Sequence, residues 1–246
     1  MKIIFAGTPE FAARHLEIVL QSEHEVLSVL TQPDRKSGRG KKINFSPVKK
    51  TALDNGISIH QPESLGIEKV LSDLKNITPD LILVVAYGLL VPKKILELPK
   101  YGCVNIHASL LPRWRGASPM EHAIMSGDKN IGISYMKMSE GLDEGPVYEM
   151  HECSLKEYDT LHTVEEKFIQ LSEKYLVSFL DNLESCSIKH KAQDENKATF
   201  SPKIDKKFLQ IDWQGDSSLE IIRKIKGYQL SLIHISEPTR LLSMAY

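Results

Sequence analysis

The sequence lacks the features that mark several large classes of protein. It has only three cysteines, Cys103, Cys153 and Cys186, which are far apart and odd in number, so neither a disulfide framework nor a cysteine-bound metal site is expected. No apolar run approaches the roughly 20 residues of a membrane-spanning helix, and the first residues form too short an apolar stretch for a signal peptide. These absences predict a cytoplasmic protein that neither enters a membrane nor holds a metal.

An excess of charge of one sign is also missing. Lysine and arginine total 31 against 32 aspartate and glutamate, which gives a net charge of −1. Binding to nucleic acid through the whole surface is therefore excluded, and such a role needs a local patch. One patch exists at residues 35–42, Arg-Lys-Ser-Gly-Arg-Gly-Lys-Lys, with five basic residues in eight. Its composition suits a phosphate-binding loop or a solvated loop equally well, and the absence of interleaved aromatics argues against a base-stacking platform.

Two common fingerprints are absent from the chain. It has no Gly-x-Gly-x-x-Gly dinucleotide motif and no Gly-x-Ser-x-Gly nucleophile motif. The stretch Gly7-Thr8-Pro9 therefore predicts a tight turn from a strand into a helix, with Thr8 as the cap of that helix. The helix start can still bind an anionic or polar part of a substrate.

The apolar pattern predicts strands that alternate with helices. We expect strands at 2–6, 25–31, 57–60, 81–86, 103–107, 131–138 and 147–152, and helices at 10–20, 47–53, 67–74, from 92 onward, 119–125 and 161–180. This alternation is typical of an α/β protein with a Rossmann-like, doubly wound and mostly parallel sheet. Residues 181–212 are more polar and predict an extension that leads away from this domain.

The most informative group of residues is Asn105, His107 and Asp143. Residues two apart on a strand share a face, so the amide and the imidazole lie side by side where an open α/β sheet builds its active site. An imidazole can take a proton from an attacking amine, an amide can donate to an oxyanion, and a carboxylate can orient the imidazole. Without an activated Ser or Cys, the pattern indicates direct acyl transfer between two bound substrates. Spacing alone also suits a hydrogen-bonded structural pair.

Several ordered segments resemble the methionyl-tRNA formyltransferase family. They are Phe5-Ala-Gly-Thr-Pro-Glu-Phe-Ala12, Thr31-Gln-Pro-Asp-Arg35 with Gly38-Arg-Gly-Lys-Lys42, Ser46-Pro-Val-Lys49, residues 80–88, residues 105–119, Gly141-Leu-Asp-Glu-Gly-Pro146, Ala198-Thr-Phe-Ser-Pro-Lys-Ile204 and Ile211-Asp-Trp213. Together they extend over nearly all of residues 1–227, which is far more specific than one Asn-x-His pair.

The resemblance implies formyl transfer from 10-formyltetrahydrofolate to the α-amino group of methionine on initiator methionyl-tRNA, without a metal and by a monomer. It places catalysis at Asn105, His107 and Asp143. It implies folate contacts by Ser109, Leu110, Leu111 and Pro112, with Ala86, Tyr87 and Gly88 lining the pterin pocket. It implies tRNA contacts by Arg39 above all, together with Arg35, Lys36, Lys41 and Lys42.

The resemblance ends before the carboxyl-terminal residues. We expect a catalytic domain at 1–180, a linker and the start of a C-terminal region at 181–227, and a foreign-looking tail at 228–246 in place of the family's β-barrel domain. We therefore hypothesise that the catalytic domain folds and binds folate but binds tRNA weakly. Two alternatives remain: a formyltransferase for a small amine, such as glycinamide ribonucleotide or an amino sugar, and an inactive remnant that binds folate or tRNA.

Overall fold

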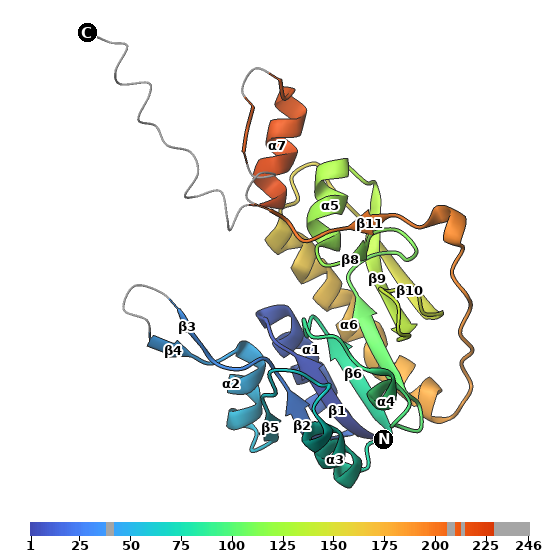
Figure 1. The fold of residues 1–246 in the computed structure, drawn as a ribbon. Coiled ribbons are helices and arrows are strands. Elements are labelled where there is room, and N and C mark those ends of the chain that lie inside the picture. Colours follow the sequence, from blue (N-terminus) through green and yellow to red (C-terminus); the bar gives the residue numbers. More distant parts are fainter. Residues whose placement is uncertain (38–41, 206–209, 213–214, 229–246) are drawn as a thin grey trace.

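A seven-stranded sheet forms the centre of the molecule in the computed structural model (Figure 1), which describes residues 1–37, 42–205, 210–212 and 215–228. Its strand order is β10-β9-β7-β6-β1-β2-β5. The strands are β1 (Lys2–Gly7), β2 (Glu25–Leu30), β5 (Ser58–His60), β6 (Leu81–Val85), β7 (Cys103–His107), β9 (Asn130–Lys137) and β10 (Val147–Ser154). Strands β5, β2, β1, β6 and β7 run parallel, whereas β9 and β10 are antiparallel to their neighbours.

Helices cover both faces of the sheet. Alternate residues of β1 show the two layers: Ile3 and Phe5 join one buried cluster, and Ile4 and Ala6 join the other. The first face carries α1 (Glu10–Leu20), α2 (Pro47–Asp54), α5 (Pro119–Ser126) and α6 (Leu161–Glu184), and the second carries α3 (Glu68–Ile77) and α4 (Lys93–Leu96). The predicted α/β, doubly wound and mostly parallel architecture is confirmed.

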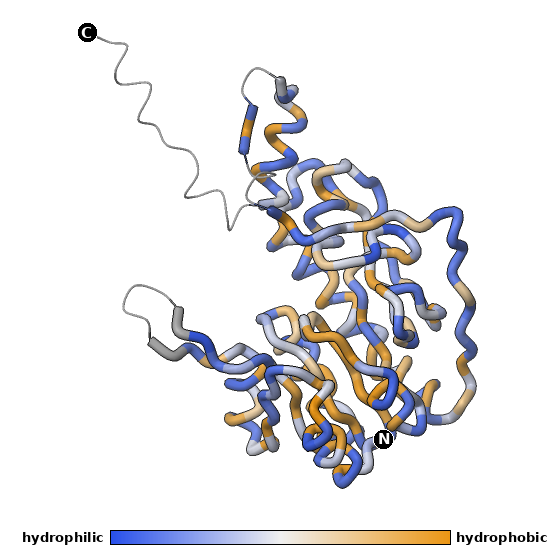
Figure 2. The backbone as a smooth tube through the Cα atoms, in the orientation of Figure 1, coloured by the Kyte–Doolittle hydropathy of each residue, from blue (hydrophilic) through white to orange (hydrophobic). Residues whose placement is uncertain are grey.

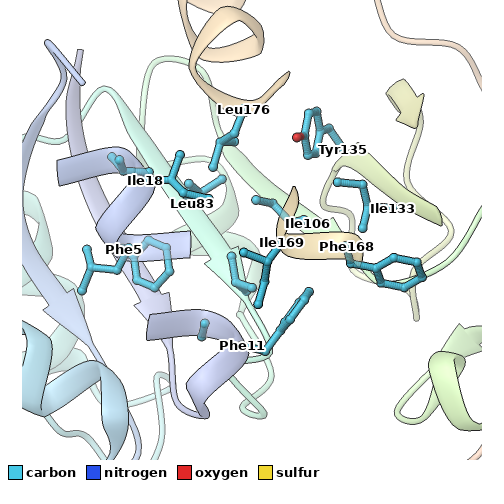
Figure 3. Packing of buried hydrophobic residues seen from close by; sticks show 14 of the residues in the cluster. Phe5, Phe11, Ile18, Leu83, Ile106, Ile133, Tyr135, Phe168, Ile169 and Leu176 are labelled. Carbon is cyan, nitrogen blue, oxygen red and sulfur yellow. The ribbon is translucent and has the colours of Figure 1, made fainter. Parts of the chain in front are cut away.

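The larger core lies between the sheet and the helices α1 and α6. In Figure 3, Phe5, Leu83 and Ile106 from the sheet face Phe11 of α1 and Ile169 and Leu176 of α6. In Figure 2, the longest hydrophobic stretches of the tube lie where Figure 1 draws the central strands. Such doubly covered strands read as apolar runs, which is why the sequence predicts them well.

The chain after α6 returns to the domain rather than leading away from it, so that prediction was wrong. Lys191 forms a bridge with Val147 at the edge strand β10, and η1 (Glu195–Lys197) follows. Strand β11 (Phe200–Ser201) then pairs in parallel with β8 (Arg115–Gly116), and α7 (Ser218–Gly227) packs on α5. Figure 1 shows this connection passing along one side of the molecule before it crosses back to β8.

Two local predictions also differ from the structure. Pro9, rather than Thr8, is the N-cap of α1, because the Thr8 hydroxyl instead donates to the Tyr87 carbonyl oxygen. The basic stretch predicted as a loop contains two short antiparallel strands, β3 (Arg35–Ser37) and β4 (Lys42–Asn44), which extend from the sheet in Figure 1. The tail at 229–246 lies outside the described residues.

Candidate active site

Strand β7 carries the first two residues of the predicted catalytic group. The strand lies inside the sheet between β6 and β9, and Asn105 and His107 pair with Met136 and Ser134 of β9. His107 is 5% exposed, whereas Asn105 is half-buried. The flanking Val104 and Ile106 point into the hydrophobic core, so the pleat turns the two polar side chains toward the opposite face.

Asp143 reaches these residues from the turn between β9 and β10. Its main chain has a φ of +50°, a left-handed conformation that aspartate tolerates better than most residues. One carboxylate oxygen, Oδ2, accepts a hydrogen bond of 2.9 Å from the Gly116 amide and lies 3.7 Å from His107 Nδ1. The other, Oδ1, accepts a bond of 3.4 Å from Asn105 Nδ2. The structure therefore brings the three predicted residues together, although 38 residues separate Asn105 from Asp143.

The surroundings of His107 fix which nitrogen carries the proton. Nε2 lies 2.9 Å from the carbonyl oxygen of Trp114. Because a carbonyl oxygen only accepts, the neutral imidazole is protonated at Nε2 and has its lone pair on Nδ1. That lone pair lies on the side of Asp143, so protonation of Nδ1 creates an imidazolium beside a carboxylate.

The Asn105 amide can donate a second hydrogen bond. Its amide nitrogen has two N–H groups, of which one points to Asp143 across 3.4 Å. The second can donate to an oxygen that gains negative charge next to the imidazole. The arrangement thus provides a proton acceptor, an oxyanion donor and a carboxylate within one small region, which suits acyl transfer to an amine.

The segment Ser109–Pro112, predicted to contact folate, is shaped by internal hydrogen bonds. The buried Ser134 hydroxyl donates to the Ser109 carbonyl oxygen over 2.6 Å and accepts from the Leu111 amide over 3.1 Å. The Ser109 hydroxyl donates to the Arg113 carbonyl oxygen, so this side chain supports the loop itself. The peptide bond between Leu111 and Pro112 is cis. Leu110 and Pro112 are the half-buried members of the segment and present the surface that a ligand can touch.

The end of β6 alternates exposed and buried residues. The Tyr87 side chain is 2% exposed and packs into the smaller core, while its carbonyl oxygen accepts bonds from Thr8 and Gln32. Ala86 and Gly88 are exposed and have φ values of +45° and +80°. The exposed part of this strand end is therefore Ala86 and Gly88, and the Tyr87 ring takes no part in it.

Part of the basic stretch forms the short antiparallel strands β3 and β4. Arg35 and Lys36 are on β3 and Lys42 is on β4, whereas Arg39 and Lys41 lie outside the described residues. Arg35 is exposed and donates to the Gln32 side-chain oxygen over 3.1 Å. The hairpin thus leaves the sheet beside the carboxyl end of β2.

Sequence reasoning missed the support that the base of this hairpin receives. The Lys49 ammonium binds the Asp34 carboxylate and, at 2.8 Å, the Gln61 side-chain oxygen. Gln61 in turn donates to Asp34 and to the Gln32 carbonyl oxygen, each over 2.9 Å. The hydrogen bond from Lys49 holds the pKa of the Asp34 carboxyl below its usual value. Lys49 belongs to one of the segments that resemble the family, and nothing in its spacing indicates an ion pair with Asp34.

Sequence reasoning also missed the residues that hold the catalytic group from outside. The Trp114 carbonyl oxygen binds His107, and the Gly116 amide binds Asp143. Both lie next to or within β8, which is held by Thr199 and Ser201 from the later segment. The resemblance at residues 198–204 was a signal that this segment matters, although it gave no contact.

The remaining chemistry-bearing features do not compete with this group. Burial raises the pKa of the Cys103 thiol to about 12, so it is not a nucleophile. Across the part of the chain that the structure describes, no three acidic, histidine or cysteine side chains gather in a way that suits a metal ion. Within the same residues, no helix is long and apolar enough to cross a membrane.

Comparisons with known proteins agree with the predicted family. The sequence profile of the formyl transferase family matches residues 1–180. The methionyl-tRNA formyltransferase of Legionella pneumophila (strain Corby) is 42% identical over 228 residues, which are 93% of this chain and 72% of that protein. The methionyl-tRNA formyltransferase of Hydrogenovibrio crunogenus is also 42% identical, over 93% of this chain and 73% of that protein.

Solved structures share the fold at lower identity. WlaRD, a sugar 3N-formyl transferase crystallised with dTDP and 5-N-formyl-THF, superposes with a TM-score of 0.71 at 19% identity, covering 93% of this chain and 79% of that one. Glycinamide ribonucleotide transformylase 1 from Symbiobacterium toebii gives a TM-score of 0.66 at 16% identity, covering 79% of this chain and 94% of that one. The chain therefore belongs to the formyl transferase family and, within it, to the methionyl-tRNA formyltransferases.

Proposed function

We propose that the protein transfers the formyl group of 10-formyltetrahydrofolate to the α-amino group of methionine on initiator methionyl-tRNA. The observation that carries the chemical part is the position of His107, whose Nε2 is bound to the Trp114 carbonyl oxygen and whose Nδ1 lone pair lies 3.7 Å from the Asp143 carboxylate. The acceptor is supported by the relatives at 42% identity, which are named for methionyl-tRNA, and by the basic hairpin.

The three side chains divide the reaction between them. His107 Nδ1 accepts the proton that the methionine amine loses as its nitrogen bonds to the formyl carbon. Asn105 donates its free N–H to the formyl oxygen as that oxygen becomes negative, and loss of such a donor costs on the order of 10²–10³-fold in rate. Asp143 stabilises the imidazolium at 3.7 Å. His107 then gives the proton to the departing folate nitrogen, so one C–N bond forms, one breaks and no proton is lost.

The formyl donor fits the strand ends beside this group. 10-Formyltetrahydrofolate supplies a formyl group on nitrogen and leaves as tetrahydrofolate. Ala86 and Gly88 offer exposed main chain to the flat pterin, and Leu110 and Pro112 offer an apolar surface on the other side of β7. The buried Ser109, Leu111 and Tyr87 hold these surfaces in place rather than forming them.

The tRNA acceptor is assigned to the hairpin. A basic hairpin that extends from the sheet edge can follow a phosphate backbone, because Arg and Lys contacts to phosphate position a nucleic acid independently of its sequence. Arg39 is proposed as the specific contact, with Arg35, Lys36, Lys41 and Lys42 binding backbone phosphates. An enzyme for a small amine does not need such an extension.

A formylation assay tests the proposal. The purified chain is mixed with 10-formyltetrahydrofolate and either charged initiator tRNA, glycinamide ribonucleotide or a nucleotide-linked amino sugar. We expect formyl transfer to the methionyl-tRNA only. Transfer to a small amine alone would replace the tRNA assignment, and folate binding without any transfer would show an inactive binding protein.

A further inference from the structure

We propose that Gln193 is a positioning residue for Asp143, and that the segment Gln193–Ser201 completes the catalytic site from outside the residues that the family profile matches. The proposal rests on the catalytic role proposed above for Asp143. Residues 193–201 follow α6 and lie beyond residue 180, where the profile match ends. They cross back over the loop that carries Asp143 and over β8.

The first observation is that Gln193 holds the Asp143 turn by its main chain. The Gln193 Nε2 group donates to the carbonyl oxygen of Asp143 over 2.8 Å and to that of Gly145 over 2.7 Å. The turn is both strained and tightly packed. Asp143 has a left-handed φ of +50°, and a Cβ added to Gly145 would lie 1.9 Å from the Lys137 carbonyl oxygen. Such a conformation persists only where surrounding contacts hold it. Gln193 uses both of its N–H donors here, so the amide is fully committed to the turn.

The second observation is that Arg115 fixes the direction of the Gln193 amide. Two guanidinium nitrogens of Arg115, Nε and Nη2, donate to Gln193 Oε1 over 3.0 and 2.9 Å. Because Arg115 can only donate, the amide oxygen must face it and the NH2 group must face the turn. Arg115 is 2% exposed, and its charge is balanced by a bidentate salt bridge with Glu195. Nη1 donates to Oε2 over 2.9 Å, and Nη2 donates to Oε1 over 2.7 Å. Gln193 is therefore held from one side and holds Asp143 on the other.

The third observation is that the same segment also supports His107. Ser201 pairs with Gly116, and its hydroxyl donates to the Trp114 carbonyl oxygen over 3.1 Å. That carbonyl oxygen is the acceptor for His107 Nε2, and the Gly116 amide is the donor to Asp143. The segment thus reaches the imidazole through Trp114 and the carboxylate from two directions.

These contacts place Gln193 in a distinct role. Its amide nitrogen binds main chain of the turn and its amide oxygen binds Arg115, so it acts on the site through the position of Asp143. Its loss should displace the Asp143 carboxylate from the imidazole and lower the rate of the chemical step. Misplacement of a catalytic group by about 1 Å can cost on the order of 10²-fold in rate.

The test is a double-mutant cycle in the full chain. Gln193→Met keeps the size of the side chain but removes both donors, and Gln170→Met makes the same change at an exposed position of α6. Each is combined with Asp143→Asn, and kcat, both KM values and the melting temperature are measured with methionyl-tRNA and the formyl donor. We expect Gln193→Met to lower kcat about 10-fold or more with unchanged KM values, and Gln170→Met to leave kcat unchanged.

The cycle separates positioning from general support. If Gln193 acts through Asp143, Gln193→Met has little further effect on kcat in the Asp143→Asn background. Equal fold-losses in both backgrounds, or a fall in melting temperature without a fall in kcat, would overturn the proposal. If Asp143→Asn alone leaves kcat unchanged, the catalytic role of Asp143 fails first, and this result is distinct from a failure of Gln193.

Discussion

At the scale of single residues, the proposed proton transfer depends on which partner each ring nitrogen of His107 faces. His107 can act as a base at Nδ1 because its Nε2–H donates to the Trp114 carbonyl oxygen, which leaves the lone pair on Nδ1 beside Asp143. This division between the two ring nitrogens is set by main-chain geometry, and it assigns the proton-transfer step to one atom.

The first prediction is that His107→Ala lowers the single-turnover formylation rate by about 10²–10⁴-fold, because the amine loses its proton acceptor. Binding of the folate should stay largely intact, since the surfaces assigned to it belong to other residues. Rapid-quench formylation and fluorescence titration with a folate analogue measure the two quantities. An unchanged single-turnover rate would remove His107 from the mechanism.

The second prediction concerns Gly116, whose amide binds Asp143. Its φ is +122°, and a Cβ there would lie 2.6 Å from the Ser201 carbonyl oxygen. Gly116→Ala should therefore push β11 away from β8, lower stability by about 1–3 kcal/mol and reduce kcat. Urea unfolding and initial rates measure these effects.

Gly66→Ala is the matched control for that substitution. A Cβ at Gly66 meets only the Ser64 hydroxyl, at an ordinary distance of 3.5 Å. This variant should keep both its stability and its rate. Equal behaviour of the two variants would show that the β8–β11 contact does not shape the site.

At the scale of elements, the hairpin β3–β4 depends on an anchor outside itself. Lys49, at the start of α2, binds Asp34 and Gln61 just before the hairpin, and the neighbouring Lys50 is exposed. The third prediction is that Lys49→Met raises the KM for methionyl-tRNA about 5-fold, or about 1 kcal/mol, by loosening the base of the hairpin. The KM for the formyl donor should not change.

Lys50→Met provides the comparison, because it removes the same charge from the same helix without touching the anchor. Steady-state kinetics with each substrate varied in turn measure both variants. Similar rises in the tRNA KM for the two variants would mean that lysine charge alone, and not the position of the hairpin, controls tRNA binding.

Elements that bury apolar surface were predictable from the sequence, and elements held by polar contacts were not. Leu81–Val85 reads as a buried strand because helices cover both of its faces. Strands β8 and β11 are two residues each and exist through pairing of distant segments, so no local pattern reveals them. For the same reason Asn105 and His107 could be paired from their spacing, whereas their distance from Asp143 required the fold.

At the scale of the whole molecule, the helices α1 and α6 are joined by a buried polar contact within the larger core. His15 of α1 donates from Nδ1 to the Phe11 carbonyl oxygen at 2.6 Å, and its Nε2 accepts from the Ser172 hydroxyl of α6 at 2.8 Å. This arrangement satisfies the neutral imidazole and leaves no place for a second proton. Burial lowers the pKa of His15 from 6.5 to about 4, with a smaller effect from Arg14.

The fourth prediction is that the fold loses stability as the pH falls from 6.5 toward 4. In this range the unfolded chain binds a proton at His15 that the folded chain does not, so the free energy of unfolding rises with pH and is fully restored above 6.5. At pH 5 the loss from this group is about 2 kcal/mol. Urea unfolding at pH 7 and pH 5 should show it, and His15→Gln, which cannot titrate, should lose that amount less between the two pH values. Equal losses in the two proteins would assign the acid sensitivity to other groups.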